Sequence, residues 1–111
     1  MRPRHYILVD RKPVEEPDLL TWAIWFGTAD RHVRLSEQVD VCVSTVFVGH
    51  DHNFNDHGPP LLFETMAFVG HETVGCERYA TWAEAEEGHA RHVAEVFKAT
   101  PILAMPDKGA A

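Results

Sequence analysis

The chain has 111 residues, of which 45% are hydrophobic and 24% charged, enough for one globular domain and too few for two. Its formal charge of -7 argues against general nucleic-acid binding, which needs a basic face. No run of about 18 apolar residues predicts a membrane span, and residues 1–5 lack the apolar segment of a signal peptide. Cys42 and Cys76 are too few for a disulfide framework, so we expect two thiols in a cytoplasmic protein.

The first elements are a strand and a helix. Residues 5–9 are aromatic and β-branched and predict a strand, which a polar turn containing Pro13 follows. Pro17 disfavours helical backbone in the residue before it. We therefore expect a helix over residues 19–27, with Asp18 as its N-cap.

This first helix is apolar on all sides, because Thr21 is its only polar side chain. Such a helix is normally buried on more than one side, which predicts that it packs deep in a small core. The alternative is that Ile24 or Trp25 contacts a partner or a second subunit.

Four strands are predicted in the middle of the chain. Residues 31–37 alternate polar with apolar side chains, and residues 41–48 and 61–69 are rich in β-branched and aromatic ones. A shorter strand is expected at residues 76–80. The polar loop 49–60 joins the two long strands as an antiparallel hairpin.

A second helix follows the strands. Thr81 and Glu84 match a capping box, which begins a helix over residues 82–99. Residues 1–100 are thus predicted to form a single α+β domain, and residues 101–111 a flexible tail. The order of elements favours a two-layer sandwich, in which two α-helices cover one face of an antiparallel sheet of four to five strands.

The densest polar cluster is the loop 50–57, with three His, two Asp and two Asn. Imidazole and carboxylate are common ligands of zinc, iron and manganese, and His50 and His52 share one side of an extended strand end. The spacing matches no standard zinc signature. The alternative is a solvated loop, in which Asp51 and Asn53 hydrogen-bond to the backbone and shape the turn.

A second cluster lies on the last helix. Glu86 and His89 are one turn apart near its apolar stripe, and Glu-x-x-His is half of the di-metal pattern of helix bundles. Only one copy of this motif is present. The alternative is a buried His89 that is hydrogen-bonded to a backbone carbonyl.

Glu64 is the third candidate, because its strand face also carries Met66 and Phe68. A lone carboxylate on a packed apolar face requires a partner. The available partners are Arg34, His52 and His89. If the face meets solvent instead, Met66 and Phe68 form an exposed apolar patch. A carboxylate–imidazole pair can act as a general base, which makes His52 and Glu64 candidate catalytic residues.

Several segments carry a recognisable pattern. The letters are STVFxGxDHNF, GPPLLFETM and RYATWxEAxxGH, within residues 44–54, 58–66 and 78–89. With Tyr6–Leu8 and Asp18–Trp22, they resemble a family of small proteins that tailed bacteriophages and prophages encode widely, and the resemblance covers residues 5 to about 97.

The resemblance implies an accessory protein of viral origin that acts in the bacterial cytoplasm, and no activity is established for the family. Asp51 and His52 match the loop of the family, whereas His50 and His57 depart from it. Four residues therefore remain the main candidates for a functional site. These are Asp51, His52, Glu64 and His89.

The first functional hypothesis is a binding protein without catalytic activity. It would act in host interaction or counter-defence, as an anti-CRISPR-like inhibitor or a sponge for a nucleotide signal. Its partner would be a host protein or a small nucleotide-type ligand, and its acidic surface could mimic nucleic acid. Its candidate binding residues are Asp51, His52, Asn53, Phe54 and Trp25. The lack of a nucleophile motif favours this hypothesis.

Two other hypotheses stay open. One is a small metal-dependent hydrolase or nuclease, with Asp51, His52, Glu64 and His89 converging on one divalent ion. No other cofactor is expected. The other is a structural protein of the virion, whose apolar first helix would associate with itself in a homodimer.

Overall fold

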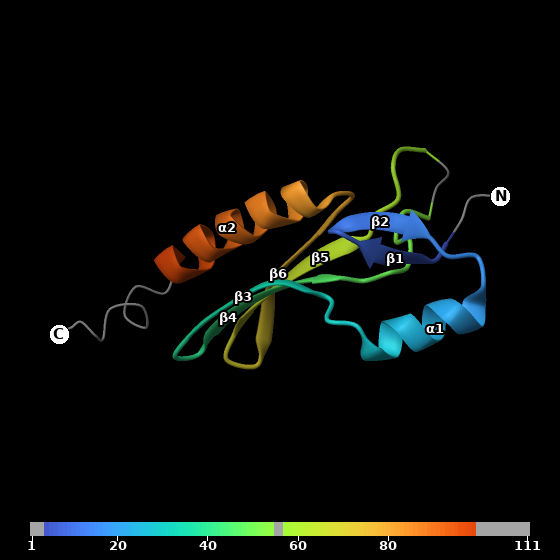
Figure 1. The fold of residues 1–111 in the computed structure, drawn as a ribbon. Coiled ribbons are helices and arrows are strands. Elements are labelled where there is room, and N and C mark those ends of the chain that lie inside the picture. The colour runs from blue at the N-terminus through green and yellow to red at the C-terminus, as the bar shows by residue number, and fades with distance from the viewer. Residues whose placement is uncertain (1–3, 55–56, 100–111) are drawn as a thin grey trace.

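The computed structural model describes residues 4–54 and 57–99 as an α+β fold of six strands and two helices (Figure 1). The first sheet pairs β1 (Tyr6–Val9) with β2 (Lys12–Glu15). The second is antiparallel, in the order β3 (His32–Gln38), β4 (Val41–Phe47), β5 (Phe63–Val69) and β6 (Glu72–Tyr79). The helices are α1 (Leu19–Thr28) and α2 (Trp82–Ala99). The predicted fold class is confirmed, and the predicted tail, 101–111, lies outside the described residues.

The core lies between α2 and the four-stranded sheet (Figure 1). Every second residue of β4 is buried, as the two-residue period of a strand requires when one face is covered. Phe47 and Phe63 meet edge to face at 5.2 Å, and Val43 and Ala67 continue the packed layer under α2. The position of these side chains fixes the register of the central strands.

The start of α2 confirms the capping box. The amide of Glu84 donates to Thr81 Oγ1 (3.1 Å), and the amide of Thr81 donates to Glu84 Oε1 (3.2 Å). Ala85, His89 and Val96 are buried on the face of α2 that meets the sheet. The predicted apolar stripe of this helix is therefore confirmed.

The strand β2 was not predicted from the sequence, which indicated a polar turn containing Pro13 at this place. Asp10 and Arg11 have φ angles of 52° and 68°, and Val9 pairs with Lys12 across them. Two residues with positive φ form a tight hairpin turn, which brings residues 12–15 against β1. Pro13 is tolerated because a two-stranded ribbon consists of edge strands.

The helix α1 lies beside β1, at the opposite end of the fold from the C-terminal end of α2 (Figure 1). Its predicted N-cap is confirmed, since the Thr21 amide donates to Asp18 Oδ2 (3.0 Å). Trp22 Nε1 lies 3.0 Å from the Tyr6 carbonyl and 3.1 Å from the Gly49 carbonyl. No residue of α1 is buried, so the predicted deep packing of this helix is wrong.

No helix in residues 4–54 and 57–99 is both long enough and apolar enough to cross a membrane.

Candidate binding surfaces and a buried polar chain

The loop between β4 and β5 is held by its own Asp and Asn side chains. Asp51 is fully buried, and its Oδ1 accepts hydrogen bonds from the amides of Asn53 (2.8 Å) and Leu61 (3.0 Å). Asn53 Nδ2 donates to the carbonyls of His57 (2.7 Å) and Pro59 (2.9 Å). These bonds confirm that Asp51 and Asn53 shape the turn.

Three imidazoles gather where the N-terminal segment crosses this loop. The ring centroids of His5 and His50 are 5.1 Å apart, and those of His50 and His52 are 5.8 Å apart. Burial lowers the pKa of His50, and the neighbouring His5, His52 and Arg4 lower it further. Phe54 is 72% exposed beside them, with the Arg4 guanidinium 5.3 Å from its ring centroid.

The four residues predicted to converge on one ion are not brought together. His89 bonds to side chains on the α2 side of the sheet, whereas Glu64 lies on the opposite face, because successive strand side chains alternate. Asp51 and His52 lie in the loop after β4. Within the part of the chain that the structure describes, no three His, Cys, Asp or Glu side chains form a group able to hold a metal ion.

Glu64 pairs with Arg78, its direct neighbour on β6, at 3.0 Å. The partners considered from the sequence, Arg34, His52 and His89, were therefore the wrong ones. The Glu64 side chain is 18% exposed, and Met66 and Phe68 are half-buried on the same face, which points away from α2. The hydrogen bonds of the two candidate catalytic residues go to other groups: Glu64 accepts from Arg78, and His52 Nδ1 lies 2.8 Å from the His50 carbonyl.

A chain of side-chain hydrogen bonds crosses the sheet beneath α2. His89 is 2% exposed, with Nε2 2.9 Å from Ser36 Oγ and Nδ1 2.8 Å from Thr45 Oγ1. The hydroxyls of Thr45 and Thr65 are 2.6 Å apart, and the Tyr79 hydroxyl lies 3.0 Å from Thr65 Oγ1. Each strand of the four-stranded sheet contributes one member. The burial of His89 is confirmed, but its partners are hydroxyls instead of a backbone carbonyl.

Glu77 ends this chain at the surface. Its Oε1 accepts hydrogen bonds from the Tyr79 hydroxyl (3.2 Å), Arg91 (3.0 Å) and His92 (3.0 Å). Burial acts to raise the pKa of the Glu77 carboxyl, but the bonds from Arg91 and His92 outweigh it, and the pKa is lowered. Glu77 is therefore an ionised acceptor.

The hydroxyl proton of Tyr79 lies within reach of two acceptors, Thr65 Oγ1 (3.0 Å) and Glu77 Oε1 (3.2 Å). Both ring nitrogens of His89 meet a hydroxyl, so its tautomer follows from which way the hydroxyl protons of Ser36 and Thr45 point. Burial lowers the pKa of His89, which favours the neutral imidazole.

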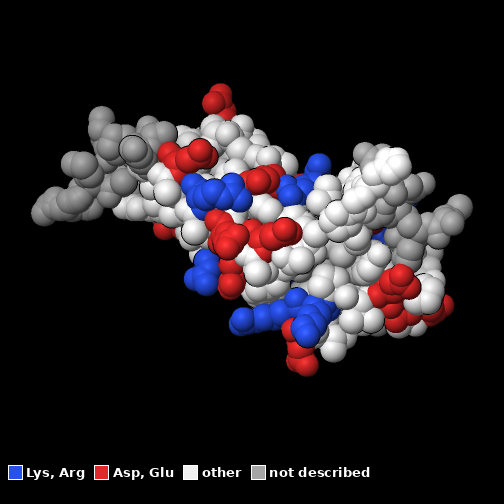
Figure 2. Space-filling view, turned by 90° about the horizontal axis from the view of Figure 1, so that it is seen from above, with Lys and Arg blue, Asp and Glu red and all other residues white. Residues whose placement is uncertain are grey.

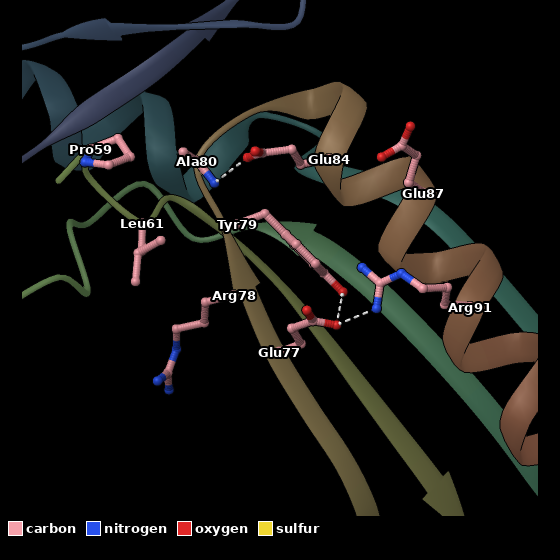
Figure 3. A pocket seen from close by; sticks show the side chains of 9 residues that line it. All are labelled: Pro59, Leu61, Glu77, Arg78, Tyr79, Ala80, Glu84, Glu87 and Arg91. Carbon is pink, nitrogen blue, oxygen red and sulfur yellow. Dashed lines mark hydrogen bonds and ion pairs between the residues drawn. The ribbon is translucent and has the colours of Figure 1, made fainter.

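A cavity of about 400 Å³ opens at the Glu77 end of the chain, between β6 and α2 (Figure 3). Tyr79 reaches from β6 toward Glu77 and Arg91, and Glu84 and Glu87 contribute from α2. None of these residues was a candidate site residue from the sequence, because only the fold brings Glu77 and Tyr79 of β6 beside Glu87 and Arg91 of α2.

Gly88 gives Tyr79 its place under the helix. A Cβ atom at position 88 would overlap the phenolic ring and the hydroxyl of Tyr79. The close approach of a ring to the backbone of α2 thus requires glycine there. The Gly88-His89 pair in the sequence pattern has a structural reason, since Gly88 admits Tyr79 and His89 begins the polar chain.

The outward side of α1 carries three exposed large hydrophobic side chains. Leu19, Leu20 and Ile24 are 59%, 69% and 61% exposed, respectively. Trp25, a predicted binding residue, lies on the packed side instead, with its ring edge-on to Phe47 at 5.8 Å. Of the two residues predicted to contact a partner, Ile24 and Trp25, Ile24 is the exposed one.

The charged residues on the α2 side are mixed in sign. Figure 2 shows Asp and Glu interspersed with Lys and Arg on the face seen from above. Ion pairs on this side include Arg34–Glu86 (3.7 Å) and Arg91–Glu77 (3.0 Å). This face therefore offers no continuous acidic surface that would imitate nucleic acid.

Comparisons of the chain with protein-family models, with curated proteins and with solved structures found no match. The resemblance to the bacteriophage family consequently rests on the sequence pattern.

Proposed function

We propose that this protein is a binding protein without catalytic activity, which docks α1 into an apolar groove of a partner protein. In keeping with the resemblance to bacteriophage proteins, the partner is a host protein in the bacterial cytoplasm. The observation that carries the proposal is the exposure of Leu20 and Ile24 on a helix that has no charged side chain.

The spacing of the outward residues supports this mode of binding. Leu20, Ala23, Ile24 and Gly27 stand at positions i, i+3, i+4 and i+7, which place them on one side of a helix. Helices that bind in grooves use anchors with this spacing. The opposite side of α1 carries Trp22 and Trp25 and holds the helix on the protein.

The size of α1 favours a groove over a second copy of the chain. A helix of 10 residues offers a strip roughly 15 Å long and about 10 Å wide. Each partner of a stable complex buries roughly 800 Å². Two copies that touched only through α1 would bury much less, whereas the walls of a groove also contact the flanks of its exposed side.

Affinity capture from a bacterial lysate tests the proposal. We compare the wild-type protein with Ile24→Glu and with Leu35→Glu, a matched change at a residue of β3 that is 51% exposed. We expect one protein to bind the wild type and Leu35→Glu but not Ile24→Glu, and the purified pair to reproduce the complex.

Three results would contradict the proposal. One is capture that Ile24→Glu leaves unchanged, and another is the absence of any specific protein. The third is a dimer of the purified chain, measured by light scattering, that Ile24→Glu dissociates. In that case the partner that covers α1 is a second copy of this chain and not a host protein.

A further inference from the structure

A second surface that can bind a partner is the edge of the four-stranded sheet, which β6 forms. Among the described strands, β6 pairs only with β5. The Tyr79 carbonyl accepts a hydrogen bond from the Leu62 amide (2.8 Å) and so points toward the β5 side. Since the N–H and C=O groups of successive strand residues point to alternate sides, those of Cys76 and Arg78 point to the open edge. An open edge is a template for a further strand.

The usable part of this edge is short. The register of β5 and β6 shifts between Ala67 and Phe68, which leaves Val74 as an extra residue. Such bulges twist an edge away from flat pairing. At the other end, the Ala80 amide already donates to Glu84 Oε1 (3.1 Å). A new strand would therefore pair along Gly75–Tyr79, with about four main-chain hydrogen bonds to Cys76 and Arg78.

The cavity beside Tyr79 adjoins the same stretch of β6 (Figure 3). The two arginines in its lining are each paired with a glutamate at 3.0 Å. On the side of α2, Glu87 interacts electrostatically with the same Arg91, and Glu84 accepts hydrogen bonds from the amides of Ala80 and Thr81. Three glutamates and two arginines line the cavity, and the partner of Arg78 is Glu64, outside this lining. A side chain that enters the cavity from a strand on β6 thus meets an excess of negative charge.

We propose that the β6 edge binds an extended peptide segment of a partner protein, with a Lys or Arg side chain in the cavity beside Tyr79. The added strand supplies main-chain hydrogen bonds, and the cavity selects the cation. This site uses neither Leu20 nor Ile24. It is therefore independent of the function proposed for α1, and a result that refutes one proposal leaves the other unaffected.

The test is an NMR titration of the ¹⁵N-labelled full chain with the probe peptide acetyl-Thr-Val-Lys-Val-Thr-amide. We expect shifts and slowed hydrogen exchange at the amides of Cys76 and Arg78. The same peptide with Glu in place of Lys should bind about tenfold more weakly, which corresponds to about 1.4 kcal/mol.

Variants of the protein distinguish binding at a specific site from general attraction to the net charge of the protein. Glu87→Lys should weaken the Lys peptide about tenfold and strengthen the Glu peptide. Glu95→Lys, the same change at an exposed position of α2 outside the cavity, should leave both affinities unchanged. Cys76→Pro removes one outward N–H without loss of a bond to β5, so it should also weaken binding.

The proposal is overturned if millimolar peptide leaves the β6 amides unchanged, or if the Lys and Glu peptides bind equally well. It is also overturned if Glu95→Lys acts as strongly as Glu87→Lys. Ile24→Glu provides the remaining control. It should abolish capture through α1 while peptide binding at β6 stays intact.

Discussion

Replacing Gly88 by Ala tests the packing on which the buried polar chain depends. In an exposed helix interior this change stabilises a protein by about 1 kcal/mol, because Ala has the higher helix propensity. At position 88 the new methyl group would overlap the ring of Tyr79. Forcing an extra methyl into a packed core costs about 1–3 kcal/mol. Displacing the ring also weakens the bonds of its hydroxyl to Thr65 and Glu77, each worth about 1 kcal/mol.

We expect Gly88→Ala to lower the free energy of unfolding by about 2–4 kcal/mol. Urea denaturation followed by circular dichroism measures this change. Gly27→Ala is the matched control, because nothing lies within 4 Å of a Cβ atom at that helical position, and it should be neutral or stabilising.

A double-mutant cycle assigns the cost to Tyr79. With Tyr79→Ala in the background, Gly88→Ala should no longer destabilise the protein, because the methyl group fills space that the ring has left. The reasoning is refuted if Gly88→Ala stabilises the wild-type protein as much as Gly27→Ala does, since the ring would then have room to move.

Three further predictions follow from the described geometry. Val39 has a φ of 52° in the β3–β4 turn, where a β-branched residue is strained. Val39→Gly should therefore raise stability by about 1 kcal/mol in thermal unfolding. A loss of stability would show that Val39 is not strained. Burial lowers the pKa of His89, so the unfolded chain takes up a proton more readily. Stability should therefore fall as pH drops below about 6.5, and His89→Gln should reduce that slope in urea titrations. Trp25→Ala should cost about 2–4 kcal/mol and Ile24→Ala less than about 0.5 kcal/mol; equal losses would show that both sides of α1 are packed.

The elements that the sequence predicted correctly are those whose signals are local. The alternation in residues 41–47 and the capping box at Thr81 and Glu84 depend on near neighbours in the chain. In contrast, β2 depends on a hairpin turn through Asp10 and Arg11, and the identity of these two residues does not predict a positive φ. Local pattern therefore identified β1, the central strands and α2, but not β2, the second strand of the ribbon that precedes α1.

The candidate site was harder to predict, because its members meet only in three dimensions. Thr45 and Thr65 stand at inward positions of otherwise apolar strand faces, and this was the available signal for a polar partner of His89. The partner of Glu64 could not be chosen without the register of β5 and β6, which places Arg78 directly opposite. Spacing in the sequence cannot supply that register.

The two helices give the strongest contrast in the molecule. α2 behaves as a covered helix should, with Ala85 and Val96 buried and glutamates toward solvent. α1 lies on the surface without a buried residue, yet it has no charged side chain. A segment of 10 residues from a chain that is 24% charged would carry about two charges by composition alone. The exposed side of α1 is thus apolar in a place where folding does not require it, because the packed side already holds Trp22 and Trp25. A requirement outside the folded chain explains this composition better, and the partner that we propose to cover Leu20 and Ile24 would supply it.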